Sequence, residues 1–291
     1  MSKAKGKSKK EKKAEFMIKL ENSRILKAIV ETLKNIIDEA KIQITPGEFK
    51  ITAMDPSRIC LLQLIIKKGG FDEFSCSKEC EVILNLDDLD KIMKRSAIND
   101  VIELNYNEDI QKIKIRMQRD GSNRARTFSL ALLDSDIEVI PLENLLESEY
   151  DSEWAMDPDL LVEAIKDAEI YSEILNIKSD EENGLILSSS GVIGEMVYEM
   201  DLEGLLEPEL NGVNTGAYSL TFLKAILKIA SITEKLDISL KTDHPIKMVF
   251  SLLEGGLLSC FLAPRVEEEE TDFETHDFEW DDPLEEIEED E

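Results

Sequence analysis

Apolar positions recur at helical spacing in four separate stretches of the chain. The first stretch has apolar residues at positions 25, 26, 29, 30, 33, 36 and 37, at intervals of mainly three and four residues. This periodicity is typical of an amphipathic helix with one buried face. Similar stretches predict further helices over 86–96, 158–171 and 220–230.

Short runs rich in β-branched and aromatic residues flank each predicted helix, and turn residues such as Pro46-Gly47 and Gly255-Gly256 separate them. The predicted strands cover 41–45, 49–54, 59–67, 81–85, 101–106, 112–118, 127–133, 174–178, 184–189, 195–200, 235–241, 246–252 and 257–262. One unit, a helix with antiparallel strands, therefore occurs four times. The repetition predicts an α+β fold of two similar domains, each an antiparallel sheet with helices on one face.

The strands and helices predict an N-terminal domain over 15–133 and a C-terminal domain over 151–266. Between them, the segment 134–150 is acidic and lacks a clear period, so we expect an interdomain connector or a binding loop. The two ends differ in composition. Residues 1–14 form a Lys-rich arm and residues 267–291 an acidic tail, and both compositions predict disorder.

The net charge of the 291-residue chain is −29. The tail holds 16 of the acidic residues, whereas residues 1–13 hold seven Lys and one Glu. Without both ends, residues 14–266 still carry a net charge of −19. This acidic body argues against a protein whose whole surface is positive for gripping nucleic acid.

The four cysteines are expected to be reduced, because the chain is large and begins without a secretory signal. Cys76 and Cys80 have no histidine or further cysteine nearby, which is a weak metal signal, so we expect neither metal nor cofactor. Since no run of about 18 apolar residues occurs, we expect no membrane span and a cytoplasmic location.

An enzyme is one alternative. The sequence has no phosphate-binding Gly-x-x-x-x-Gly-Lys-Ser/Thr loop and no His-Glu-x-x-His pair. Its two histidines, His244 and His276, lie in a predicted turn and in the acidic tail. We therefore predict no catalytic residues.

The predicted helices share a second property, because each carries Lys or Arg on its polar side. These residues are Lys27 and Lys34; Lys91, Lys94 and Arg95; Lys166; and Lys224 and Lys228. One interpretation is an ordinary solvated face with i,i+4 ion pairs. The other is a phosphate-facing surface, favoured by the recurrence of positive charge on four equivalent helices of an acidic protein.

Several motifs resemble sliding clamps of the proliferating cell nuclear antigen type, as found in archaea and eukaryotes. They are Arg24-Ile25-Leu26-Lys27, Ala53-Met54-Asp55-Pro56-Ser57-Arg58, Gly70-Phe71, Asn85-Leu86 with Ile92-Met93-Lys94, Leu133-Asp134-Ser135-Asp136, and Leu262-Ala263-Pro264-Arg265-Val266-Glu267-Glu268-Glu269. The resemblance covers about residues 15–270 and leaves out both terminal extensions.

The resemblance implies a ring of three subunits that encircles duplex DNA and acts as a processivity factor for DNA polymerase. Helices would line the hole and contact phosphates without reading the bases. The DNA-facing residues would be the eight basic helix residues named above together with Lys78. Glu163, one turn before Lys166, departs from the more positive lining of many relatives. Two alternatives stay open: a clamp-like interaction scaffold without DNA, and one subunit of a heterotrimeric clamp.

The resemblance also implies how subunits and clients bind. Edge strands at 124–130 and about 193–200 would pair between subunits, unless both are internal strands. DNA polymerase, flap endonuclease, ligase and the clamp loader would insert short peptide motifs into an apolar pocket. Its residues would be Met54, Arg58, Ile59, Leu61, Ile140, Leu142, Pro245, Phe261, Ala263 and Pro264. Taken alone, Ile59, Leu61 and Phe261 would look the same in any sheet core.

Two hypotheses concern the ends. Phe278 and Trp280 of the acidic tail fold back into the pocket and compete with clients, or the tail is only an acidic extension. The Lys-rich arm adds non-specific attraction to DNA or partners, or it only aids solubility. For a clamp, we expect an association with the nucleoid, or a nuclear location if the source is eukaryotic.

Overall fold

The computed structural model of the chain describes residues 15–119, 121–135, 137, 140, 143–252 and 255–265. The predicted basic arm 1–14, the acidic tail 267–291 and the pocket residue Leu142 lie outside these residues. Every strand pair in the described chain is antiparallel. The strands form sheets of five, nine and four strands.

The five-stranded sheet belongs to the first half of the chain. Its order is β5 (Glu73–Cys76), β1 (Phe16–Leu20), β7 (Asp100–Asn107), β8 (Lys112–Arg119) and β9 (Ala125–Ala131). The four-stranded sheet belongs to the second half. Its order is β13 (Gly194–Met200), β12 (Gly184–Gly191), β11 (Ile174–Asp180) and β15 (Val213–Ser219).

The nine-stranded sheet joins both halves. Its order is β14 (Leu206–Leu210), β10 (Ser152–Met156), β16 (Leu236–Leu240), β17 (Ile246–Ser251), β18 (Gly256–Leu262), β4 (Cys60–Lys67), β3 (Glu48–Met54), β2 (Glu39–Ile44) and β6 (Cys80–Asn85). The junction is the pairing of β18 with β4 over seven residues. Both strands are apolar on both faces and largely buried, which is why neither ends a sheet.

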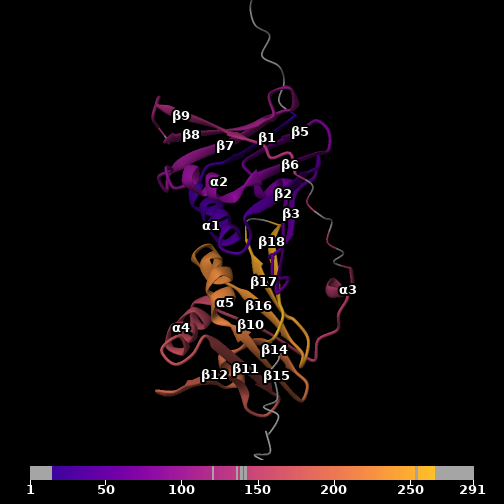
Figure 1. Cartoon of the computed structure of the whole chain (residues 1–291), viewed down its shortest axis with the longest axis vertical. Helices are drawn as coiled ribbons and strands as arrows, with labels where there is room; N and C mark the ends of the chain where they lie inside the picture. Colours follow the sequence, from indigo (N-terminus) through magenta and orange to yellow (C-terminus); the bar gives the residue numbers. More distant parts are fainter. Residues whose placement is uncertain are drawn as a thin grey trace, which may run out of the picture.

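Four helices lie on one side of the molecule, and three of them begin at side-chain caps. They are α1 (Ser23–Lys34), α2 (Leu86–Met93), α4 (Pro158–Ala168) and α5 (Leu220–Ile226). Asn22, Asn85 and Asp157 accept hydrogen bonds from backbone amides in the first turns of α1, α2 and α4. Figure 1 shows these four helices on the same side, with the connector helix α3 (Glu143–Leu146) on the opposite side.

The helices also contact one another across the two halves. Helix α1 packs on α2, on α5 and on the 3-10 segment Leu227–Ile232 that continues α5. The guanidinium of Arg24 on α1 donates to the carbonyl oxygen of Ser231 in that segment. Helices from both halves therefore form one continuous layer.

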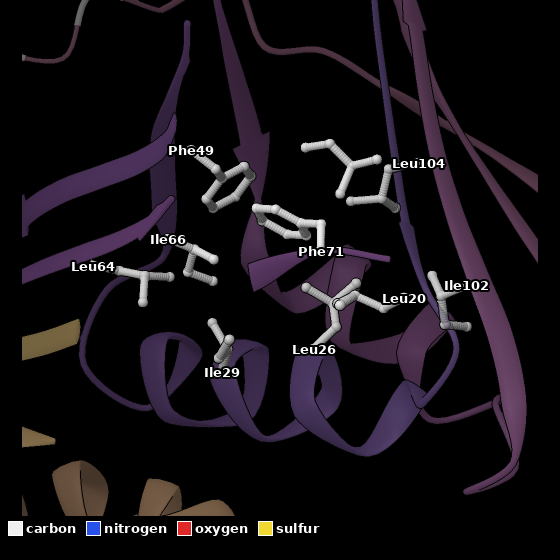
Figure 2. A pocket seen from close by; sticks show the side chains of 10 residues that line it. Leu20, Leu26, Ile29, Phe49, Leu64, Ile66, Phe71, Ile102 and Leu104 are labelled. Carbon is white, nitrogen blue, oxygen red and sulfur yellow. The ribbon is translucent and has the colours of Figure 1, made fainter. Parts of the chain in front are cut away.

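Apolar side chains between this layer and the sheets form the core. In the first half, Phe49 and Phe71 meet edge to face, with ring centroids 6.1 Å apart, above Leu26 and Ile29 of α1 (Figure 2). The alternating burial of β1, β2 and β3 places every second side chain in this core. The amphipathic pattern of the helices and strands is thus satisfied.

The predicted fold of two similar antiparallel α+β units is confirmed, but three details of the prediction were wrong. The predicted helices 86–96, 158–171 and 220–230 end as α-helices at Met93, Ala168 and Ile226. Five strands were not predicted: β1, β5, β10, β14 and β15. The sheets are also not confined to one half each, because β4 and β18 pair.

Candidate nucleic-acid interface and docking patch

The exposed side of the helix layer carries most of the predicted DNA-facing residues. Eight of the nine lie within the helices, in the 3-10 segment that continues α5, or at the C-terminal end of α2. They are Lys27, Lys34, Lys91, Lys94, Arg95, Lys166, Lys224 and Lys228. Lys78 differs, because it lies between β5 and β6, where its ammonium is 2.6 Å from Glu108 Oε2. Lys27 is half-buried, whereas Lys166 and Lys228 are exposed.

A buried carboxylate joins α1 to α2. Asp90 Oδ2 is 3.1 Å from Lys34 Nζ and 2.8 Å from Lys94 Nζ. Burial disfavours the charged form of Asp90, but the hydrogen bonds from Lys94 and Lys34 outweigh it and hold the pKa of this carboxyl below its ordinary value. Asp90 therefore fixes two ammonium groups from two helices side by side.

Other carboxylates compensate further positive charges. Lys91 Nζ lies 2.9 Å from Asp88 Oδ1, and Lys224 pairs with Glu169. By contrast, Lys27, Lys166 and Lys228 make no ion pair with any carboxylate in the described part of the chain. The interpretation as a solvated, ion-paired face thus applies to part of the surface. The charges without an ion pair lie on α1, on α4 and on the 3-10 segment that continues α5.

Helix α4 has the least favourable charge for a polyanion. Asp159, Glu163 and Asp167 share this helix with the single cation Lys166. Because three carboxylates accompany one ammonium group, we expect α4 to contribute little to a DNA-facing surface.

A second candidate site is a small apolar cluster, separate from the main core, that we call the docking patch. Leu61 of β4 and Phe261 of β18 are buried register partners at its base. Met54, Ile140 and Leu145 pack against them and remain partly exposed. Ile59, with 38% of its surface exposed, adjoins the base through the chain. These residues come from β3, the segment before β4, β4 itself, the connector and β18.

The other predicted pocket residues lie around the patch or outside the described residues. Pro245, Ala263 and Pro264 are half-buried, and Arg58 is exposed with a positive φ of 61°. Leu142 is not described, so its position stays a prediction. Sequence reasoning missed Leu145; the adjacent apolar pair Leu145-Leu146 in an otherwise acidic connector is the signal that could have identified it.

Asp55 holds the loop beside the patch. One of its carboxylate oxygens accepts hydrogen bonds from the amides of Ile59 and Cys60, both at 2.6 Å, and the other accepts one from Ser57 at 2.8 Å. Asp55 is 3% exposed, so these amides need the carboxylate as their partner. The aspartate of the Asp-Pro-Ser-Arg motif therefore stabilises the loop that carries Ile59 of the patch.

Tyr150 attaches the end of the connector to the second half. Its hydroxyl donates to the carbonyl oxygen of Pro245 at 3.1 Å, and Lys247 Nζ lies 6.0 Å from its ring centroid. Burial raises the pKa of Tyr150 to about 12, so the hydroxyl stays protonated and donates at neutral pH.

The two strands expected at subunit contacts both end their sheets in the described chain. β9 pairs only with β8, and β13 only with β12. The turn between β12 and β13 exposes Val192 and Ile193 almost completely. Each of these two edge strands has backbone groups that pair with no further strand of the described chain. One edge belongs to the first half of the chain and the other to the second half.

The described residues contain no group of three or more His, Cys, Asp or Glu residues arranged to hold a metal ion. Among the same residues, no helix is long and apolar enough to cross a membrane.

Comparison with known proteins gives one family throughout. The N-terminal domain model of proliferating cell nuclear antigen matches residues 15–139, and the C-terminal domain model matches residues 144–265. A DNA polymerase sliding clamp of Thermofilum pendens is 31% identical over 250 residues, 84% of this chain and 97% of that protein. One of Pyrococcus horikoshii is 29% identical over 255 residues, 87% of this chain and 99% of that protein.

Solved structures agree in fold. The proliferating cellular nuclear antigen of Entamoeba histolytica has a TM-score of 0.78 at 24% identity and covers 87% of this chain and all of its own. The corresponding protein of Thermococcus kodakaraensis has a TM-score of 0.77 at 22% identity over 86% of this chain and all of its own. The two family models together span nearly all described residues, and so this chain belongs to the proliferating cell nuclear antigen family.

Proposed function

We propose that this chain is a subunit of a DNA polymerase sliding clamp, a ring that encircles duplex DNA and tethers the polymerase to it. The observation that carries the proposal is the single helix layer. Helices of both halves lie on one side and carry Lys27, Lys166 and Lys228, while the nine-stranded sheet joins the two halves (Figure 1). The relatives named as sliding clamps support this function.

The chemistry of this layer suits loose contact with phosphates. Duplex DNA carries about one negative charge per 1.7 Å of its axis, so scattered ammonium groups attract it without sequence preference. Partial compensation by Asp88, Asp90 and Glu169 limits that attraction. A ring retained by its closed shape rather than by affinity can then slide, and its function is that of a tether without catalysis.

We further propose that three copies of the chain close the ring through β9 and β13. The β13 edge presents Glu195 and Glu199, whereas Arg124 lies at the β9 edge, where Arg126 is already paired with Asp100 at 2.6 Å. Opposite charges on two different edges of one chain favour a head-to-tail contact between copies, which closes into a ring. A homotrimer is thus favoured over a mixed trimer.

The docking patch would receive client proteins. Its partly exposed apolar side chains over a buried base suit a peptide turn with one aliphatic and two aromatic side chains. Clients of this kind would be DNA polymerase, flap endonuclease, ligase and the clamp loader. We place the protein wherever the genome is replicated, in the nucleoid or in the nucleus.

The test is a variant with Lys27, Lys94, Lys224 and Lys228 all changed to alanine. We expect processive synthesis by the cognate polymerase on long primed templates to fall at least about tenfold, because phosphate contacts are lost. A control removes four lysines on strands and turns instead: Lys50, Lys67, Lys68 and Lys178. Normal processivity of the helix variant would favour the alternative, an interaction scaffold that does not hold DNA.

A further inference from the structure

The docking patch lacks a cover within the described chain. Met54, Ile140 and Leu145 are only partly buried, and Ile59 is 38% exposed, over the fully buried pair Leu61 and Phe261. An apolar cluster of this kind gains free energy when an aromatic side chain removes it from water. A segment of the same chain that begins near the patch can contact it at a higher effective concentration than a separate protein can.

The chain leaves the fold at this patch. After β18, the amide of Ala263 donates to the carbonyl oxygen of Ile59 at 2.9 Å, and the amide of Arg265 donates to that of Ala217 at 2.8 Å. Arg265 is the last described residue, and 26 residues follow it. The described chain thus ends two residues after Ala263, which is bonded to Ile59 of the patch.

The C-terminal segment 266–291 carries the chemistry that the patch needs. Among its carboxylates stand Phe273, Phe278, Trp280, Leu284 and Ile287. Twelve residues lie between Arg265 and Phe278. By random-coil statistics they span about 20 Å, so both aromatic residues can return to the patch.

We propose that Phe278 and Trp280 seat on the docking patch of their own chain and compete there with client peptides. The inference rests on the proposed client-binding function of the patch and adds its regulation. The exposed cation Arg265 directly precedes the C-terminal segment and suits the neighbouring Asp277 and Glu279. The helix lysines suit carboxylates as well, but the helix layer lies on the side opposite the connector helix α3 (Figure 1).

Tethering makes a weak contact sufficient. A short linker gives an effective concentration of the order of millimolar, so a segment whose dissociation constant is about two- to ninefold below that value would occupy the patch most of the time. Clients would displace it at a cost of about three- to tenfold in apparent affinity. Client binding would then be selective for the stronger motifs.

The first experiment measures affinity in the full chain. The probe is a synthetic peptide with a helical turn of one aliphatic and two aromatic side chains. We expect the Phe278→Ala, Trp280→Ala double variant, which keeps every carboxylate, to bind it about three- to tenfold more tightly than the unmodified chain. The comparison variant Asp277→Asn, Glu279→Gln keeps both aromatic residues, so it should raise the peptide affinity clearly less than the aromatic double variant does. Equal affinities of the aromatic variant and the unmodified chain would overturn the inference.

The second experiment observes Trp280 directly. The chain has two tryptophans, and Trp154 is buried in β10, so Trp154→Phe leaves Trp280 as the single reporter. We expect blue-shifted emission that moves to the red when the peptide is added or when Ile140→Ser alters the patch. Solvent-exposed emission without peptide, or a blue shift that grows with protein concentration and so reports contact between copies, would contradict the inference.

The two proposals fail in different ways. In the first case the peptide binds the chain and Ile140→Ser abolishes this binding, but removal of Phe278 and Trp280 does not change the affinity. Only the inference about the C-terminal segment then fails. If the peptide does not bind even a chain that ends at residue 270, the client function of the patch fails as well.

Discussion

The amide of Ala263 donates a 2.9 Å hydrogen bond to the carbonyl oxygen of Ile59. This bond joins the end of the last strand to the loop that enters β4, and thereby the last part of the fold to the first half. It continues the pairing of β18 with β4 by one residue beyond Leu262 and Cys60. The docking patch and the junction between the halves are consequently parts of the same structure.

Removing the carboxylate of Asp55 is expected to weaken this structure. Asp55→Ala leaves three amides of the loop without their acceptor, which should lower the free energy of unfolding by about 1–3 kcal/mol. Because the loop carries Ile59, client-peptide affinity should also fall several-fold. Urea unfolding and peptide titration measure the two effects.

The matched control for Asp55 is Asp72→Ala. Asp72 also accepts a backbone hydrogen bond, from Glu21 at 2.7 Å, but it is exposed and distant in the fold from the patch. Peptide affinity should not change in this control. A similar loss of peptide affinity in both variants would show that Asp55 has no specific effect on the patch.

The ion pairs of Asp90 predict a pH-dependent contribution to stability. The folded-state pKa of Asp90 is lower than its ordinary value of 3.8, so its stabilising effect is fully present above that pH and is lost as the pH falls through the folded pKa. Asp90→Asn should therefore destabilise the chain by about 1–3 kcal/mol at neutral pH, since it leaves Lys34 and Lys94 without their shared partner. The difference from the unmodified chain should shrink below about pH 4.

Asp88→Asn serves as the comparison, because it removes the same charge from the same helix. Asp88 is exposed and pairs only with Lys91, so its loss should change the free energy of unfolding by less than about 0.5 kcal/mol. Thermal or urea unfolding across pH 3–7 measures both variants. A destabilisation by Asp90→Asn that persists unchanged at the acid end would contradict the ion-pair explanation.

The four thiols predict an order of alkylation. Burial raises the pKa of Cys60 to about 12, with a further contribution from the Asp55 carboxylate, and burial raises the pKa of Cys260 well above its ordinary value. Both lie in the β4–β18 junction, whereas Cys76 and Cys80 are half-buried, and burial raises the pKa of Cys80 to about 12. Iodoacetamide followed by mass spectrometry should modify Cys76 first, and faster as the pH rises and the thiolate fraction grows. Equally fast modification of Cys60 or Cys260 would mean that the junction opens readily in the native state.

The turn before β13 should be sensitive to a single methyl group. A Cβ at Gly191 would lie 1.9 Å from the carbonyl oxygen of Tyr171, so Gly191→Ala must displace the turn or the end of α4. Because β13 follows this turn, we expect self-association to weaken at least about tenfold in sedimentation experiments. At Gly47 an added Cβ meets nothing within 4 Å, so Gly47→Ala should assemble normally. Normal assembly of Gly191→Ala would argue against β13 as a subunit contact.

The sequence predicts the helices and most long strands because their apolar periodicity is strong. It does not predict β15, since Asn214 and Gly216 have low strand propensity and the strand forms through its seven-residue pairing with β11. It does not predict β14 either, because Leu206–Leu210 is mostly exposed and contains Pro208. In both cases tertiary pairing decides the conformation.

The candidate sites were predictable to different degrees. The i,i+4 pair of Asp90 and Lys94 can be read along α2, but the contact of Asp90 with Lys34 depends on the packing of α1 against α2. Similarly, Leu145 joins the docking patch only because the connector folds back over β4 and β18. Sequence periodicity does not carry such contacts between segments.

The central claim is a closed ring around duplex DNA, formed by three copies of one chain. Assembled from this chain alone, the ring should have three times the 33.0 kDa chain mass, about 99 kDa. Once loaded on a nicked circular plasmid by the cognate loader, it should stay bound in high salt, be lost when a restriction enzyme linearises the DNA, and be retained again when bulky blocks close both ends. Equal retention on circular and open-ended linear DNA, or a monomer that binds neither, would contradict the account.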